Sequence, residues 1–309
     1  MKDEIVEKSG SLDRLASAVL LVATVFVLAP LVIAVVTASQ SYQDFVQHGF
    51  SISPGTHLIE NTVKLYRTTK IFRQITNSLV VALAIATVKC LFAFLAAYAL
   101  VFFRVRYTSL MFAILMSTVA VPLDLRVITT YQILSNVAMP INELVAILSG
   151  LSDTVVHHRF DIDLKWNLLD TYAGIVAPAL ATGTGVFIMR QFFKTVPVDL
   201  VKAAQIDGAG WFRFMVDILL PISRTPLIAL FILMFLGGWT MYMWPLVAAS
   251  TPEMQTAIVG IAHLRPNAGA DVPDMPLIMS AVLVASALPV LLIASLQRFI
   301  VRGITLTEK

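Results

Sequence analysis

The sequence predicts an all-α, polytopic membrane protein with about six spanning helices. Of its 309 residues, 58% are hydrophobic and only 13% are charged, and the mean hydropathy is +0.84. A water-soluble domain has a larger charged fraction, so the bilayer is the expected solvent. Long runs with few or no charges also recur along the chain, and most approach the roughly 20 residues that a helix needs to cross the hydrocarbon core.

The clearest spans are the apolar runs at residues 15–37, 78–103, 172–189, 226–249 and 277–296. Another run, 110–121, is short alone and reaches span length only by continuing past Pro122 to about residue 134. The first run is longer than the apolar part of a cleavable signal and no A-x-A site follows it, so we expect it to remain as an anchor.

The distribution of Lys and Arg favours an orientation with both termini in the cytoplasm. Residues 1–14 and 303–309 then form short cytoplasmic tails, and the basic residues of segment 195–224 also lie inside. Lys64, Arg67, Lys70 and Arg73 fall in the first outer loop, so the positive-inside bias is moderate.

Two outer segments carry helical signals of their own. Residues 59–75 are amphipathic, which indicates either a helix lying at the membrane surface or a solvated loop. Within the long segment 137–166, apolar residues recur at helical spacing over 141–151, which favours a short surface helix. His157 and His158 are adjacent and therefore do not share a helix face as a metal pair would, so we expect solvent exposure.

Sequence signals for catalysis or metal binding are missing. The only cysteine, Cys90, lies within the second span and is expected to be a buried apolar filler, so no disulfide framework or metal site is predicted. No glycine is followed by lysine, which excludes a G-x-x-x-x-G-K-[ST] phosphate loop, and there is no H-E-x-x-H or G-x-S-x-G. We therefore predict no catalytic residues and no bound cofactor.

The most informative segment lies between the fourth and fifth predicted spans. Pro197 can open a helix, whose compact apolar face is formed by Leu200, Ala203, Ala204 and Ile206. Asp207 and Gly208 should end that helix, and a second amphipathic helix over about 210–220 should stop at Pro221. The small alanines let another protein approach closely, which favours docking of a partner over an unremarkable helical loop.

This segment resembles the loop pattern E-A-A-x3-G-x9-I-x-L-P of the membrane subunits of bacterial ABC importers. In that family the loop forms a coupling helix that sits in a cleft of the ATPase subunit. The resemblance implies an ATPase-docking loop here, with Lys202 replacing the glutamate that usually pairs with a basic ATPase residue. The residues assigned to this docking loop are Lys202, Ala203, Ala204, Asp207, Gly208, Ile218, Leu220 and Pro221.

Within the carbohydrate-importer permeases, the chain is similar to the glycerol-3-phosphate subgroup. The motifs that carry this resemblance are P-G-T-H-L-I-E-N at 54–61, N-L-L-D-T-Y-A-G at 167–174, R-Q-F-F at 190–193, G-W-T-M-Y-M-W-P-L at 238–246 and R-F-I-V-R-G at 298–303. Segment 137–166 has no counterpart in short members and is interpreted as an outer insertion.

The resemblance implies a type I ABC importer transmembrane domain over 15–302, in the cell inner membrane, that moves glycerol-3-phosphate or glycerophosphodiesters. It also implies a second permease subunit, two ATPase subunits that bind ATP and Mg, an external solute-binding protein and no nucleic acid partner. Alternatives are a permease subunit for a neutral sugar or polyol, and a stand-alone secondary transporter or channel.

Candidate substrate-pathway residues lie near two span ends. Asp124 and Arg126 follow Pro122, where charges at membrane depth are costly, so they form either a structural ion pair or a site in which Arg126 binds phosphate. For Lys89, a contact to the partner subunit or to helix-end carbonyls is preferred to a transport role. The aromatic residues of the fifth span form either an interfacial belt with packing contacts or part of the pathway: Trp239, Tyr242 and Trp244.

Overall fold

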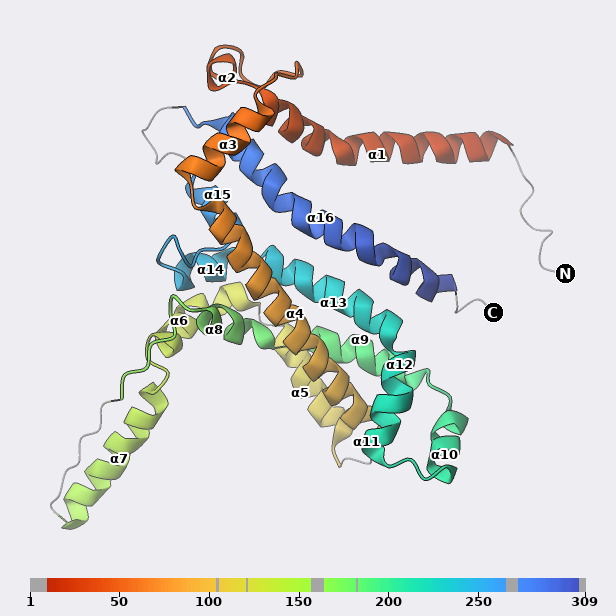
Figure 1. Cartoon of the computed structure of the whole chain (residues 1–309). Helices are drawn as coiled ribbons and strands as arrows, with labels where there is room; N and C mark the ends of the chain where they lie inside the picture. Colours follow the sequence, from red (N-terminus) through yellow and green to blue (C-terminus); the bar gives the residue numbers. More distant parts are fainter. Residues whose placement is uncertain are drawn as a thin grey trace. The chain divides into compact units, whose positions relative to one another are not determined.

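The computed structural model describes residues 10–103, 106–120, 122–156, 164–181, 183–264 and 272–305 (Figure 1). All regular secondary structure in these ranges is helical, as predicted. The chain divides into two compact units. The terminal unit comprises Met1–Ile71 and Ile261–Ala287, and the central unit comprises Phe72–Gly260 and Leu288–Lys309.

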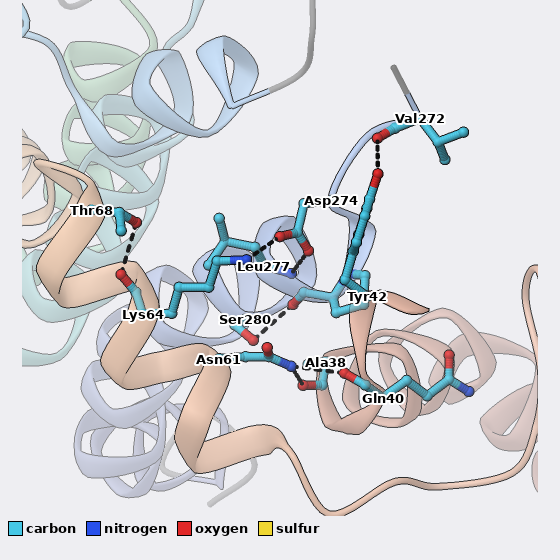
Figure 2. A network of polar contacts seen from close by, with 11 residues as sticks. Ala38, Gln40, Tyr42, Asn61, Lys64, Thr68, Val272, Asp274, Leu277 and Ser280 are labelled. Carbon is cyan, nitrogen blue, oxygen red and sulfur yellow. Dashed lines mark hydrogen bonds and ion pairs between the residues drawn. The ribbon is translucent and has the colours of Figure 1, made fainter. Parts of the chain in front are cut away.

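The terminal unit holds α1 (Gly10–Ser39), α2 (Tyr42–His48), α3 (Leu58–Thr68) and the first part of α16 (Met275–Thr305). The Asn61 amide of α3 donates 2.9 Å hydrogen bonds to the carbonyl oxygens of Ala38 and Gln40, where α1 ends. One turn further along α3, on the same face, the Lys64 ammonium group lies 2.7 Å from the Asp274 carboxylate, just before α16 (Figure 2). Buried amide contacts and an ion pair therefore join three helices that are distant in sequence.

The amphipathic segment 59–75 is resolved into two helices. Residues 58–68 form α3, so the helical interpretation of this part is confirmed and the solvated loop is not. Thr69 is extended, with φ −129° and ψ 167°, and α4 (Ile71–Phe102) begins two residues later. The expectation of one surface helix reaching residue 75 is wrong, because the last residues belong to the spanning helix α4.

The central unit is built on α4. Its core combines fully buried alanines of α4 with larger side chains, among them Met189, Phe193 and Phe235, and the buried Cys90 takes the predicted filler role. The remaining helices are α5 (Thr108–Ala120), η1 (Leu123–Arg126), α6 (Val127–Ser135), α7 (Met139–Val156), α8 (Tyr172–Val176), η2 (Ala177–Leu180), α9 (Gly183–Lys194), α10 (Val198–Ile206), α11 (Trp211–Arg213), η3 (Phe214–Leu219), α12 (Leu220–Ile222), α13 (Arg224–Trp239), α14 (Met243–Ala248) and α15 (Ala257–His263).

Three unbroken helices of the described chain are long and apolar enough to cross a membrane: Arg14–Ser39, Ile71–Phe102 and Met275–Leu296. The number rises to six if each bent helix pair counts as one span. These pairs are Asp124–Ser135 with Met139–Ser149, bent by 63°, Tyr172–Leu180 with Gly183–Lys194, bent by 50°, and Trp211–Ile222 with Arg224–Trp239, bent by 75°.

Continuous helices over 110–134, 172–189 and 226–249 are therefore wrong. The first of these predicted spans is divided into α5, η1 and α6, because Pro122 lacks the N–H that would continue α5. The second changes direction between η2 and α9, and the third ends as α13 at Trp239 before α14 begins at Met243.

Segment 137–166 contains a helix longer than expected. Residues 139–156 form α7, whereas the apolar spacing predicted 141–151. The chain that returns from it is held by two asparagines: Asn136 Oδ1 accepts from the Trp166 N–H at 3.1 Å, and Asn142 exchanges hydrogen bonds with the Leu164 backbone. His157 and His158 lie outside the described residues.

Candidate functional site

A cavity of about 480 Å³ lies where three helix breaks of the central unit meet. Its wall is formed by residues from the α5–η1 break, the η2–α9 break and the α13–α14 break, together with Ile85 and Lys89 from the middle of α4. Non-helical backbone at membrane depth is tolerated only where protein or a water-filled cavity satisfies it. Broken helices around a cavity are the common construction of transporter substrate sites.

Local sequence explains why the helices stop here. Pro122 follows α5 and Pro178 lies in η2, and neither residue can donate a backbone hydrogen bond. A Cβ at Gly238 would lie 3.1 Å from the Ala82 Cα, so this glycine allows α13 to approach α4 closely. α13 then ends as the Thr240 N–H bonds to the Leu236 carbonyl, three residues before α14 begins at Met243.

The charged groups of the cavity are two cations and one carboxylate: Lys89, Arg126 and Asp124. Asp124 and Arg126 both belong to η1, yet no salt bridge within 4.0 Å joins them in the described chain. The Arg126 Nε is buried without a hydrogen-bond partner. The alternative of a structural Asp124–Arg126 ion pair therefore receives no support, and Arg126 retains an unused donor.

The three aromatic candidates separate in the structure. Tyr242 lines the cavity, at the break between α13 and α14. Trp239 is only 5% exposed and packs in the core around α4. Trp244 is fully buried, and its indole N–H lies 3.2 Å from the carbonyl oxygens of Gly174 and Ile175. The two tryptophans therefore make the packing contacts that were expected beside a belt, and neither of them lies exposed or lines the cavity.

Sequence reasoning missed the threonines of the cavity wall and preferred a role outside transport for Lys89. Thr184 and Thr240 come from the two remaining breaks, and Lys89 lies on the cavity wall. The available signal for Lys89 was its position as a lone charge in a long apolar run, because such a charge normally faces a cavity or an opposite charge. The threonines gave no comparable signal.

The predicted docking loop begins with α10 and its C-terminal turn. Pro197 is the residue preceding the helix, not its first turn, and α10 runs from Val198 to Ile206. Gly208 has φ +74°, its N–H bonds to the Gln205 carbonyl, and the Ala209 N–H bonds to the Ala204 carbonyl. This pair of hydrogen bonds is a Schellman motif, so the predicted glycine stop is confirmed.

The side chains of α10 face two ways, which corrects the predicted apolar face. Ala204 is buried against the central unit, whereas Ala203 and Asp207 are exposed and Ile206 is 85% exposed. Lys202 is also exposed, and its ammonium group lies 3.5 Å from the Asp199 carboxylate one turn earlier. The two alanines therefore have different surroundings: the methyl group of Ala204 packs within the chain, and that of Ala203 is available to a partner.

The second helix of the loop does not stop at Pro221, contrary to expectation. Residues 211–222 remain helical because a π-helical segment, η3, precedes the proline, and the Leu220 N–H bonds five residues back to Met215. The wider turn accommodates a residue that lacks an N–H donor. Ile218 and Pro221 are partly buried and therefore help to support the loop, whereas Leu220 is exposed.

The loop is fastened to the end of α4 through aromatic packing. The Tyr98 hydroxyl donates a 2.8 Å hydrogen bond to the Trp211 carbonyl, and Phe102 and Phe214 pack with ring centroids 5.4 Å apart. A void of about 160 Å³ remains between α4 and the loop. A displacement of α10 or α11 would therefore reach the same helix that carries Lys89.

The motif at 167–174 builds the support beside Trp244. Asp170 has φ +59°, and its carboxylate accepts hydrogen bonds from the Thr251 N–H at 3.0 Å and hydroxyl at 2.8 Å. The Tyr172 hydroxyl donates to Asn77 Oδ1 at 2.7 Å. A Cβ at Gly174 would lie 2.0 Å from the Leu168 carbonyl oxygen, which explains the glycine.

Residues 90–306 match the family of binding-protein-dependent transport system inner membrane components. The chain is 33% identical over 312 residues to the sn-glycerol-3-phosphate transport system permease protein UgpE of Brucella melitensis, covering 99% of this chain and 100% of that protein. It is 35% identical over 302 residues to the protein of the same name from Agrobacterium fabrum, covering 96% of each.

A solved structure of a bacterial ABC transporter involved in the import of the acidic polysaccharide alginate has the same fold. The TM-score is 0.68 at 18% sequence identity, and the alignment covers 94% of this chain and 97% of the other. The predicted fold class is thus confirmed. The chain belongs to the family of inner membrane components of binding-protein-dependent transport systems, and it is a permease subunit of that family.

Proposed function

We propose that this chain is the permease subunit of an ATP-driven importer for sn-glycerol-3-phosphate or related glycerophosphodiesters. The observation that carries the proposal is the cavity between broken helices, with Arg126 on its wall and the Arg126 Nε without a partner. A guanidinium group matches a phosphate well, because its donors lie in one plane and form charge-assisted hydrogen bonds. The names of the similar proteins from Brucella and Agrobacterium favour the same substrate.

The energy for transport would come from partner subunits. We infer that two ATPase subunits bind ATP and Mg²⁺, and that the loop around α10 docks into one of them. The support is the exposed side of the loop, where Ala203, Ile206 and Asp207 are accessible and Gly208 holds a tight turn. Both termini and this loop then lie in the cytoplasm, in agreement with the positive-inside bias.

The remaining partners follow from the same proposal. A second, related permease subunit would complete the passage, and an external solute-binding protein would deliver the substrate on the opposite side from the loop. Closure of the ATPase subunits would move α10 and, through the Tyr98–Trp211 hydrogen bond, α4. The cavity would then change its access from one side of the inner membrane to the other.

Uptake by the reconstituted importer tests the substrate. Arg126→Ala should abolish uptake of labelled glycerol-3-phosphate while the ATPase subunits still co-purify, because the change removes phosphate donors without touching the loop. Arg67→Ala, which removes an arginine from the last turn of α3, is the matched control and should leave uptake near wild type. Unchanged uptake by Arg126→Ala would exclude the phosphate site, and uptake of a neutral sugar or polyol instead would identify the other substrate class.

A further inference from the structure

Lys89 is placed where a charge is hardest to accommodate. It lies 18 residues after Ile71, the first residue of the spanning helix α4, which is about 27 Å along the helix at 1.5 Å per residue. Its neighbours along α4 are almost all apolar. At such depth an ammonium group is stable only beside water, an opposite charge or carbonyl groups.

The structure favours stabilisation of the Lys89 ammonium group by water. Lys89 lines the cavity, and in the described part of the chain its ammonium group has no salt bridge and donates no hydrogen bond. The sequence favoured a contact to the partner subunit or to helix-end carbonyls. The contact to carbonyls is not observed among the described residues, and the contact to a partner subunit stays a prediction. The ammonium group shares the cavity with Arg126 and Asp124. The charges of Arg126 and Asp124 add to zero, so Lys89 leaves the cavity with a net positive charge.

We propose that Lys89 supplies the net positive charge of this cavity and sets its preference for a phosphate monoester over a diester. The inference rests on the proposed function. A phosphate monoester carries a charge of about −1.5 to −2 at pH 7, whereas a diester carries a single negative charge. Because Coulomb energy is proportional to the charge of the ligand, Lys89 stabilises the monoester by up to about twice as much as the diester.

Residue chemistry also suits this role. Lysine is a compact point charge with three rotatable donors and does not require the planar, two-pronged geometry of a guanidinium–phosphate pair. It can therefore add attraction for a second phosphate charge while Arg126 fixes orientation. Hydroxyl groups of Thr184, Thr240 and Tyr242 line the same wall and offer partners for the glycerol hydroxyls.

The experiment compares two substrates in the complete reconstituted importer with its binding protein. One is glycerol-3-phosphate and the other is its methyl diester, which keeps the glycerol group but carries one negative charge. The variants are Lys89→Met, which removes the charge at similar length, Lys89→Gln, which removes it in a polar form, and Lys89→Arg, which keeps it. The binding protein is identical throughout, so its own preference cancels when each variant is compared with wild type.

Lys89→Met and Lys89→Gln should lose about tenfold in monoester uptake and about threefold in diester uptake, since a doubled Coulomb energy squares the loss. Lys89→Arg should keep the wild-type ratio between the substrates. Equal losses for both substrates, or no loss in a neutral variant that assembles with the ATPase, would overturn the proposal. If wild type transports neither compound, the proposed function itself fails, which is a different result.

Discussion

The hydroxyl of Tyr98 in α4 donates a 2.8 Å hydrogen bond to the backbone carbonyl of Trp211, the first residue of the second loop helix. This bond crosses from a spanning helix to the loop that is proposed to dock onto an ATPase. The two are also joined by the ring packing of Phe102 against Phe214. The loop and α4 should therefore move together.

Tyr98→Phe should weaken coupling between ATP hydrolysis and transport. The change keeps the ring but leaves the Trp211 carbonyl without its partner, which costs about 1 kcal/mol or about fivefold in the coupled equilibrium. We expect basal ATPase activity to remain and its stimulation by the binding protein to fall. Tyr131→Phe, at an exposed tyrosine of α6, is the control. Full stimulation of Tyr98→Phe would show that the hydrogen bond plays no part in coupling.

Substitutions at Gly208 should impair ATPase docking through backbone conformation alone. A Cβ there would meet no atom within 4 Å, but φ is +74°, which costs an ordinary side chain about 1–2 kcal/mol. Gly208→Asn should be mild and Gly208→Ala worse, with ATPase co-purification as the measurement.

Gly210→Ala is the matched control for Gly208. Its added methyl group also meets open space, but φ at Gly210 is −69°, so no strain is expected. Equal losses at both positions would point to a steric contact with the partner instead of turn geometry. Gly208→Pro should abolish docking, because proline removes the N–H that bonds to the Gln205 carbonyl.

Lys202 should contact an acidic group of the partner ATPase, because it reverses the charge of the glutamate usual in this loop pattern. Lys202→Glu should weaken ATPase co-purification, and the loss should shrink at high salt because exposed charges are screened. Lys202→Arg should preserve binding. The intrahelical pair with Asp199 contributes only a few tenths of a kcal/mol, so loss of α10 itself cannot explain a large effect. Salt-independent loss would contradict the charge contact.

Asp274 should contribute more to stability than its ion-pair partner Lys64. Its carboxylate accepts the Leu277 N–H at 3.1 Å, at the start of α16, as well as facing the Lys64 ammonium group at 2.7 Å (Figure 2). Asp274→Asn keeps a helix-capping side chain and should lose the ion pair only, about 0.2–1 kcal/mol at this partly exposed site.

Asp274→Ala should lose the cap as well, a further cost of about 1 kcal/mol. Thermal unfolding in detergent, with Lys64→Met as the reference for the ion pair, measures both differences. If Asp274→Asn and Asp274→Ala unfold at the same temperature, the capping role is refuted.

Trp244 and Tyr242 should respond in opposite ways to removal of a polar atom. Trp244→Phe deletes the indole N–H that serves the Gly174 and Ile175 carbonyls, so thermal stability should fall by about 1–3 kcal/mol with an unchanged KM for uptake. Tyr242→Phe changes the cavity wall, so KM should rise with little loss of stability. A raised KM for Trp244→Phe alone would place the pathway beside Trp244 after all.

Hydropathy predicted the unbroken spans but could not locate the helix breaks. Pro30 and Pro289 lie inside α1 and α16 without ending them, whereas α5 ends just before Pro122. The same residue type therefore lies inside two helices and follows the end of another, so proline alone does not decide where a helix breaks. That information belongs to the packing and not to the local sequence.

The sequence predicted only part of the candidate site, because packing decides which side chains face the cavity. Arg126 and Tyr242 attracted attention as polar or aromatic residues near span ends, and both lie on the cavity. Trp244 has the same character but is buried, because tryptophan suits both a membrane interface and a tight core. Lys89 sits on a helix that is apolar all around, so its direction depended on how α4 packs against α13.

The three helix breaks around the cavity also determine its solvent. Backbone groups that leave a helix at these points need hydrogen-bond partners, and each one left unpaired in an apolar medium costs several kcal/mol. Between turnovers, when no substrate is bound, only water can form hydrogen bonds with these backbone groups. The cavity of this permease should therefore stay hydrated. A phosphate that passes through it remains in polar surroundings and does not enter a hydrocarbon environment.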